Sequence, residues 1–151
     1  MAHSRYRVRL MQRVFAERDF DQPPDRLFAY LSEHEHLGDL FGMRVERVRD
    51  GENGERNGVG SVRRLSFGGL LPLEETITAF EPNRRIEYRI TKGSPLRDHR
   101  GEMRFSERPG GGTHLRYEIT FGAKLPGADR VVARGLRRSI AKGLDKAASN
   151  A

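Results

Sequence analysis

The sequence predicts an α+β domain in which a curved antiparallel sheet of about six or seven strands wraps around a long C-terminal helix. Two observations indicate this class. Short stretches with strand-like alternation follow one another along the middle of the chain, separated by turn sequences such as EPN, KGSP and PGGG. Apolar residues then recur every four positions over about 20 residues, which is typical of an amphipathic helix. Because the connections are short, neighbouring strands should be antiparallel.

The N-terminal part predicts a strand followed by two short helices. We expect residues 1–10 to form a loose arm and residues 11–151 a single domain, whose first strand covers residues 11–20. The segment DQPPDRLFAYLSEHEHLGDLF begins a helix at its prolines, which fit a first helical turn because they lack a backbone N–H. Gly38 and Gly42 separate this helix from a second short one.

The remaining elements follow in the order expected of a strand meander. A strand near residues 43–48 leads into the glycine-rich connection RDGENGERNGVG. The later strands are SVRRLSF, EETITAF, RRIEYRIT, DHRGEMRF and THLRYEITFGA. The last helix begins near Pro126, and its apolar stripe consists of Val132, Leu136, Ile140 and Leu144.

Composition excludes several classes of protein. The 151 residues suffice for one domain, and no cysteine is present for disulfides, thiolate metal sites or thiol nucleophiles. Charges interrupt the first 20 residues, so they do not resemble a signal peptide, and no run of 18 apolar residues could span a membrane. We therefore expect a cytoplasmic protein. Its net charge of +7 mildly favours acidic partners.

Alternation along the strands predicts which side chains point inward. In RDHRGEMRF, one face of the strand combines His99 with Gly101, Met103 and Phe105, and the charged residues occupy the other face. Three further inward sets are expected on the same basis: Ile86, Tyr88 and Ile90; Leu115, Tyr117, Ile119 and Phe121; and Arg63, Leu65 and Phe67. Glu75, Ile77 and Ala79 should also share a face, although one bulge would reverse that assignment.

Inward polar residues among apolar ones indicate a binding cavity between the sheet and the last helix. Burying an unpaired charge costs several kcal/mol, so Arg63, Glu75 and His99 should pair with one another, be hydrated or contact a ligand. A flat hydrophobic molecule with a few oxygens suits such a lining. The predicted ligand-binding residues are Arg63, Phe67, Glu75, Ile77, Tyr88, Ile90, His99, Met103, Phe105, Tyr117, Phe121, Leu136, Ser139 and Ile140.

His99 has three interpretations. It could act as a catalytic base because its ordinary pKa suits proton transfer at neutral pH, it could orient a ligand oxygen, or it could be a core histidine bonded to Glu75, Tyr117 or water. If the site is catalytic, Arg63 and Glu75 are the other candidates. The pair His34 and His36 has no second cluster of metal ligands, and the glycine clusters lack the context of a phosphate loop. We therefore expect no metal and no cofactor.

The last helix raises two further questions. Gly135, Ser139 and Gly143 form a row of small residues, which would either allow close packing against an aromatic residue of the sheet or leave space for a ligand. The helix is also rich in basic residues, which indicates either a solvated face or docking on an anionic membrane or RNA. No aromatic residues interleave with these cations, which argues against a platform for single-stranded nucleic acid, and we expect a nucleic acid partner less than a membrane.

Several segments resemble the START-like (SRPBCC) superfamily of the polyketide cyclase/dehydrase type. They are PPDRLFAYLSEHEHL, GVGSVRRL, EETITAFEPNRRIEYRI and GGGTHLRYEITF before the last helix, and together they span nearly the whole domain. The resemblance implies a helix-grip fold that encloses a cavity for a hydrophobic, lipid-like or polyketide-like ligand. It leaves three functions open: binding or transport of that ligand, a polyketide cyclase or dehydratase acting in the same cavity, and a ribosome- or RNA-associated interaction protein.

Overall fold

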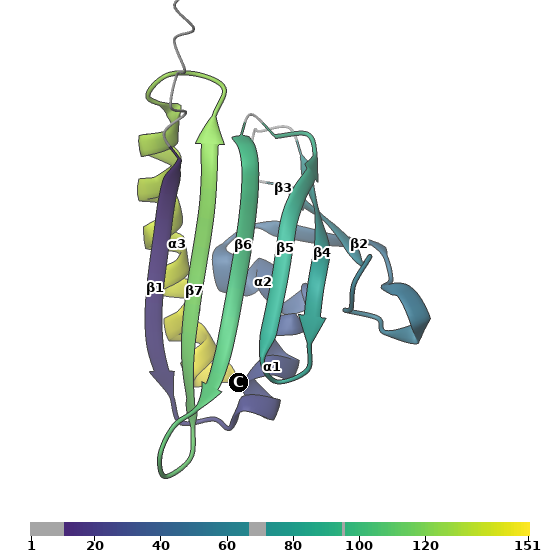
Figure 1. Cartoon of the computed structure of the whole chain (residues 1–151), viewed down its shortest axis with the longest axis vertical. Helices are drawn as coiled ribbons and strands as arrows, with labels where there is room; N and C mark the ends of the chain where they lie inside the picture. Colours follow the sequence, from purple (N-terminus) through teal and green to yellow (C-terminus); the bar gives the residue numbers. More distant parts are fainter. Residues whose placement is uncertain (1–10, 67–71, 95) are drawn as a thin grey trace, which may run out of the picture.

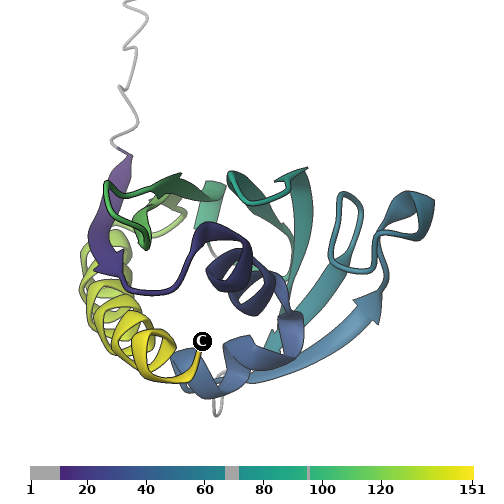
Figure 2. The same cartoon turned by 90° about the horizontal axis from the view of Figure 1, so that it is seen from below.

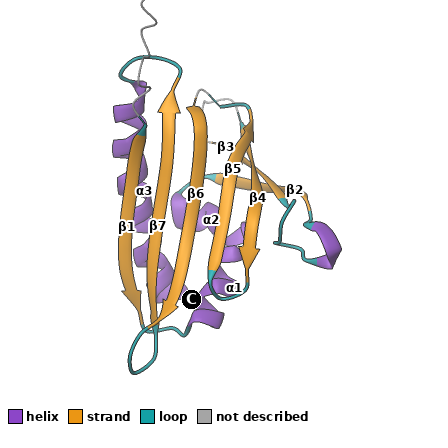
Figure 3. Ribbon diagram, in the orientation of Figure 1, coloured by secondary structure: helices purple, strands orange, loops and turns teal. Residues whose placement is uncertain are grey.

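The computed structural model describes residues 11–66, 72–94 and 96–151 and contains the elements in the predicted order (Figures 1 and 3). The N-terminal elements are β1 (Gln12–Phe20), α1 (Pro24–Ser32), α2 (His34–Phe41), β2 (Arg44–Arg49) and the short 3-10 turn η1 (Glu52–Gly54). The others are β3 (Val62–Ser66), β4 (Leu73–Glu81), β5 (Arg85–Lys92), β6 (Leu96–Glu107), β7 (Thr113–Ala123) and α3 (Ala128–Asn150).

The seven strands of the described residues form one antiparallel sheet, in the order β1-β7-β6-β5-β4-β3-β2. Strands β2 to β7 are a meander, and β1 pairs with β7 at the far edge. Since β1 and β2 lie at opposite edges, the chain between them, with α1 and α2, must cross one face of the sheet. Figure 2 shows the sheet curving around the helices on that side, which we call the inner face.

Local sequence signals account for the two short helices. Pro24 occupies the first turn of α1, where no backbone donor is needed, and Asp25 lies at the positive end of the helix dipole. Leu27, Phe28 and Leu31 form its buried side. Gly42 ends α2 in the left-handed conformation, at φ 65°, and its N–H binds the carbonyl of Gly38.

α3 completes the core by packing against β1, β7 and α2. Its predicted stripe does face inward, because Ile140 and Leu144 are buried and Val132 and Leu136 are half-buried. In the described part of the chain, no helix is both long and apolar enough to cross a bilayer.

One predicted inward set is wrong in part, because β4 contains a bulge. Glu75 pairs with Ile90 and Ile77 with Tyr88, as expected of inward residues, but the register then shifts and Ala79 pairs with Glu87. The extra residue reverses the remaining alternation. Phe80 therefore takes the inner face and packs edge to face against Phe28 at 5.1 Å.

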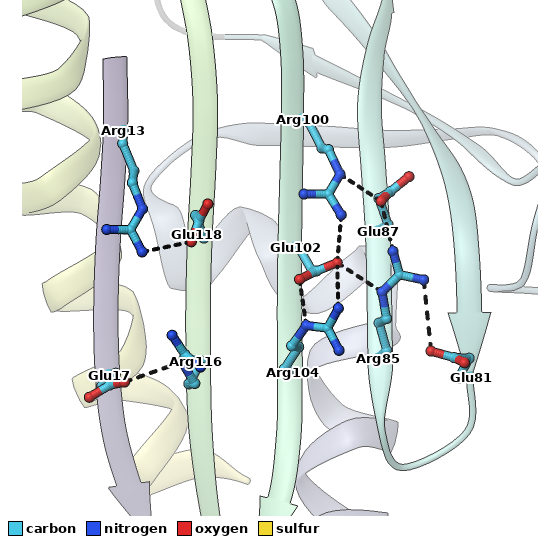
Figure 4. Close-up of polar contacts among 10 residues, drawn as sticks. All are labelled: Arg13, Glu17, Glu81, Arg85, Glu87, Arg100, Glu102, Arg104, Arg116 and Glu118. Atoms are coloured by element: carbon cyan, nitrogen blue, oxygen red, sulfur yellow. Dashed lines mark hydrogen bonds and ion pairs between the residues drawn. The ribbon is translucent and has the colours of Figure 1, made fainter. Parts of the chain in front are cut away.

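The outer face of the sheet carries rows of like charge (Figure 4). Across β5, β6 and β7, the directly opposed residues are Glu87, Glu102 and Glu118 in one row and Arg85, Arg104 and Arg116 in the next. Ion pairs run between the rows. The carboxylate of Glu102 thus forms ion pairs with Arg85, Arg100 and Arg104, at N···O distances of 2.8, 2.7 and 2.6 Å. We call the residues of these two rows, together with Arg100, the outer ion-pair lattice. Attraction between the rows offsets the repulsion within each row.

Candidate functional site

The inner face brings together five polar side chains that the sequence nominated. They come from five adjacent strands, and each is more than nine-tenths buried. We call them the inner cluster: Arg63, Glu75, Tyr88, His99 and Tyr117.

Arg63 and Glu75 form its charged centre. They are directly opposed on β3 and β4; Nε of Arg63 donates a hydrogen bond to Oε2 of Glu75 at 2.8 Å, and Nη2 lies 2.7 Å from the same oxygen as an ion pair. Burial alone would lower the pKa of Arg63, but the charge of Glu75 raises it above its ordinary value. The guanidinium also lies 4.8 Å from the ring centre of Tyr88, in cation–π geometry. Arg63 therefore remains positively charged, and its guanidinium contacts both the carboxylate of Glu75 and the ring of Tyr88.

A buried pair of tyrosines extends the cluster toward β7. The hydroxyl groups of Tyr88 and Tyr117 share a short hydrogen bond. Burial raises the pKa of Tyr117 to about 12 and that of Tyr88 well above its ordinary value, so both phenols keep their protons at neutral pH. Gly101, opposite Tyr88, permits this geometry, because a Cβ on it would lie 2.2 Å from Cζ of the Tyr88 ring.

His99 points inward as predicted, with the help of a bulge in β6. Between Arg97 and Arg100 the register with β7 shifts, and Asp98 adopts a left-handed φ of 50°. The imidazole Nδ1 accepts the backbone N–H of Ile90 at 3.1 Å, just beyond the last β5–β6 pair. Neutral His99 therefore carries its proton on Nε2. Burial lowers the pKa of His99, although the carboxylate of Glu75 acts in the opposite direction.

His34 is a buried neighbour of the cluster that the sequence did not indicate. It begins α2, is fully buried, and places Nε2 3.4 Å from the hydroxyl of Ser61. Burial, assisted by the charge of Arg63, lowers the pKa of His34 to about 3. His36 faces elsewhere, stacking on Tyr30 and binding its carbonyl oxygen at 2.8 Å. Alternation cannot locate His34, because its burial depends on how α2 docks.

The other predicted ligand-binding residues are buried to different degrees. The buried ones are Ile77, Met103, Phe105, Phe121 and Ile140, whereas Ile90, Leu136 and Ser139 are half-buried. Phe105 belongs to a separate aromatic group, since it packs edge to face against Phe28. Phe67 lies outside the described residues.

Two of the three small residues on α3, Ser139 and Gly143, face α2 and not the sheet. A Cβ on Gly143 would lie 2.4 Å from the ring of Phe41, and the hydroxyl of Ser139 donates to the carbonyl oxygen of Phe41 at 3.3 Å. Gly135 is exposed, and among the described residues no heavy atom beyond its own stretch of helix would lie within 4 Å of a Cβ at this position. Gly143 thus allows close packing against an aromatic residue. That residue, Phe41, belongs to α2 and not to the sheet as expected.

Comparisons with solved structures agree with this architecture. An aromatase/cyclase from Streptomyces sp. R1128 is 21% identical, with 91% of this chain and 94% of that chain covered and a TM-score of 0.70. A Mesorhizobium loti protein is 20% identical (91% and 95% covered, TM-score 0.69). Norcoclaurine synthase from Thalictrum flavum is 14% identical (91% and 92% covered, TM-score 0.68). At these identities the similarity establishes the helix-grip fold.

Sequence comparison identifies the family. No curated protein matches the chain significantly. A model of the family described as polyketide cyclase/dehydrase and lipid transport matches residues 11–151, which include every described strand and helix. The predicted resemblance is confirmed, and the chain belongs to the polyketide cyclase/dehydrase and lipid transport family.

Proposed function

We propose that the protein binds a small, flat hydrophobic molecule between sheet and α3, and that the inner cluster holds its oxygen atoms. The supporting observation is a surplus of hydrogen-bond donors. Arg63 donates its Nε–H to Glu75 and has further N–H groups on its terminal nitrogens. One hydroxyl of the tyrosine pair must direct its hydrogen elsewhere, and His99 has its Nε2–H. No described residue accepts these remaining hydrogens, so a ligand oxygen would satisfy them.

The charge balance of the cluster favours an uncharged ligand. Arg63 and Glu75 neutralise each other, His99 is neutral because burial lowers its pKa, and both tyrosines remain protonated. A carboxylate placed here would be a buried charge without its own counterion, which is costly. Ketone, quinone or phenol oxygens, within an aromatic or polyketide-like skeleton, fit the cluster better.

Binding without catalysis is favoured over a cyclase by the hydrogen bond of His99. A general base needs a free lone pair, but Nδ1 already accepts the N–H of Ile90 and Nε2 carries the proton. Glu75 is likewise paired with Arg63. The likeness to an aromatase/cyclase keeps cyclisation as the alternative, and product formed from a poly-β-ketone mimic would establish it.

The proposal is tested by titration calorimetry with two flat bicyclic probes, 1,4-naphthoquinone and naphthalene, of which only the first carries oxygens. If the donors act on ligand oxygens, the quinone should bind at least about fivefold more tightly, since a net hydrogen bond contributes about 1 kcal/mol. His99→Phe should reduce quinone affinity and leave naphthalene affinity unchanged. Equal affinities for both probes in the wild-type protein would contradict the proposal. Native mass spectrometry of purified protein, with solvent extraction, then identifies any natural ligand.

Leu136→Trp tests whether the binding space adjoins α3. Leu136 is half-buried on the inward stripe of the helix, so an indole should occupy space that the ligand needs. We expect both probes to lose affinity while the unfolding midpoint changes little. Arg137→Trp, one position away on the exposed side, is the matched control and should bind both probes normally. Normal binding by Leu136→Trp would place the ligand elsewhere.

A further inference from the structure

The outer side of α3 carries cations that lack carboxylate partners. α3 contains two acidic residues, and both face β1: Asp129 accepts a hydrogen bond from Gln12 at 2.7 Å, and Asp145 pairs with Arg18. None of the helix cations forms an ion pair with a carboxylate of the described residues, and residues 1–10, 67–71 and 95 include no acidic residue. The cations are Arg130, Arg134, Arg137, Arg138, Lys142 and Lys146.

Exposed aliphatic side chains lie beside these cations. Val131, Arg134, Arg138 and Lys142 follow one another at intervals of three or four residues, so they share one exposed side of the helix. Val131 is 74% exposed, and Leu125, in the turn before α3, is 67% exposed. They are the most exposed large hydrophobic residues of the described chain. Figure 2 shows that one side of α3 faces away from the other elements.

This combination fits a lipid surface better than a nucleic acid. Peripheral proteins bind anionic bilayers by inserting apolar side chains and by attracting acidic headgroups to Lys and Arg. Single-stranded nucleic acid is usually held by aromatic stacking, and α3 contains no aromatic residue. We propose that turn 124–127 and the outer side of α3 dock on an anionic phospholipid bilayer. Leu125 and Val131 enter the interface, while Arg134, Arg138 and Lys142 contact lipid phosphates.

Docking and ligand binding would then use opposite sides of one helix. Ile140 and Leu144 point to the core, whereas Arg138 and Lys142 point to solvent. The docking proposal rests on surface charge and exposed aliphatic residues alone, so it is independent of the ligand. All the docking variants named below should bind 1,4-naphthoquinone normally in solution without vesicles, which separates a failure of docking from a failure of ligand binding.

Vesicle co-sedimentation tests the docking surface. The wild-type protein should sediment with vesicles of phosphatidylcholine and phosphatidylglycerol, but weakly with phosphatidylcholine alone, and binding should decrease with added salt. Arg134→Gln/Arg138→Gln should weaken binding about 25-fold, since each cation near the surface contributes about fivefold. Leu125→Ser/Val131→Ser should weaken it about tenfold or more.

Matched variants control for charge and hydrophobicity elsewhere. Arg44→Gln removes an exposed cation from β2, and Val59→Ser removes a 43% exposed aliphatic residue from the β2–β3 connection. Both should bind vesicles as the wild type does. Failure of the wild type to sediment with anionic vesicles would overturn the proposal. So would binding that survives Leu125→Ser/Val131→Ser while single-stranded RNA binds more tightly than vesicles, which would indicate a nucleic acid partner.

Discussion

The two faces of the sheet hold buried carboxylates in opposite ways. On the outer face, Glu102 is shared by three arginines whose side chains are 22%, 33% and 57% exposed, and Glu87 likewise has several arginine partners. On the inner face, Glu75 has one ionic partner, Arg63, and both side chains are over nine-tenths buried. A redundant lattice with partly exposed arginines tolerates the loss of one member, whereas an isolated buried pair does not. The proposed ligand-binding role would account for the isolated inner pair.

Breaking the inner pair should have the largest effect. Glu75→Gln leaves the guanidinium of Arg63 buried without a counterion, so we expect a loss of about 3 to 5 kcal/mol in the free energy of unfolding. Urea titration measures this loss. A loss below about 1 kcal/mol would mean that water reaches Arg63 and that the pair is not isolated.

Acid should destabilise the fold through His34. The unfolded chain binds a proton near the ordinary pKa of 6.5, but the folded chain does so only near 3, because His34 is buried. Between these values the unfolded state binds more protons, so stability should fall as pH falls, by about 1.4 kcal/mol per pH unit. His99, whose pKa is also lowered, contributes in the same direction.

Unfolding measured from about pH 6.5 to pH 4.5 should therefore show a loss of roughly 2 to 3 kcal/mol from His34. The control is His34→Gln, which keeps a polar side chain but cannot titrate, and its stability should depend much less on pH. Parallel curves for the two proteins would show that His34 is not the titrating group.

Alanine substitutions at two glycines should have opposite effects on stability, because one glycine is in close contact with a ring and the other is exposed. Gly101→Ala places a Cβ 2.2 Å from the Tyr88 ring, so the ring must move, and we expect a loss of about 1 to 3 kcal/mol. Gly135→Ala, on the exposed side of α3, should instead stabilise the protein by about 0.5 to 1 kcal/mol. Thermal unfolding of both variants gives the comparison. A neutral Gly101→Ala would mean that Tyr88 relocates without strain.

The smallest effect is expected in the outer ion-pair lattice. Arg104→Gln removes one of three arginines around Glu102, so the loss should be below about 1 kcal/mol and should shrink further in high salt. Urea titration at low and high salt concentration tests it. A loss as large as that of Glu75→Gln would remove the distinction between the two faces.

Sequence reasoning recovered what depends on local pattern. Alternation placed His99, Tyr88 and Tyr117 on the inner face, and proline and glycine signals located α1 and α2. It failed where one residue changes the register. The bulge at Thr78 moves Ala79 to the outer face and Phe80 to the core, and no local signal distinguishes this segment from a regular strand.

Other residues depend on contacts distant in sequence. The burial of His34 requires α2 to dock near Ser61, and the position of Gly143 requires Phe41 to lie against α3. Gly101 could have been recognised, because a glycine within a strand often marks the close approach of another group. The like-charged rows of β5, β6 and β7 could not be predicted, because they depend on the register between the strands.

The most direct test of the account is the double variant Arg63→Met/Glu75→Leu, measured for both stability and ligand selectivity. Replacing a whole buried ion pair with apolar residues is often neutral or stabilising, so the variant should unfold within about 1 kcal/mol of the wild type or be more stable. We predict that it also loses the preference for 1,4-naphthoquinone over naphthalene. A folded double variant that keeps this preference would contradict the claim that the inner pair exists to hold a ligand.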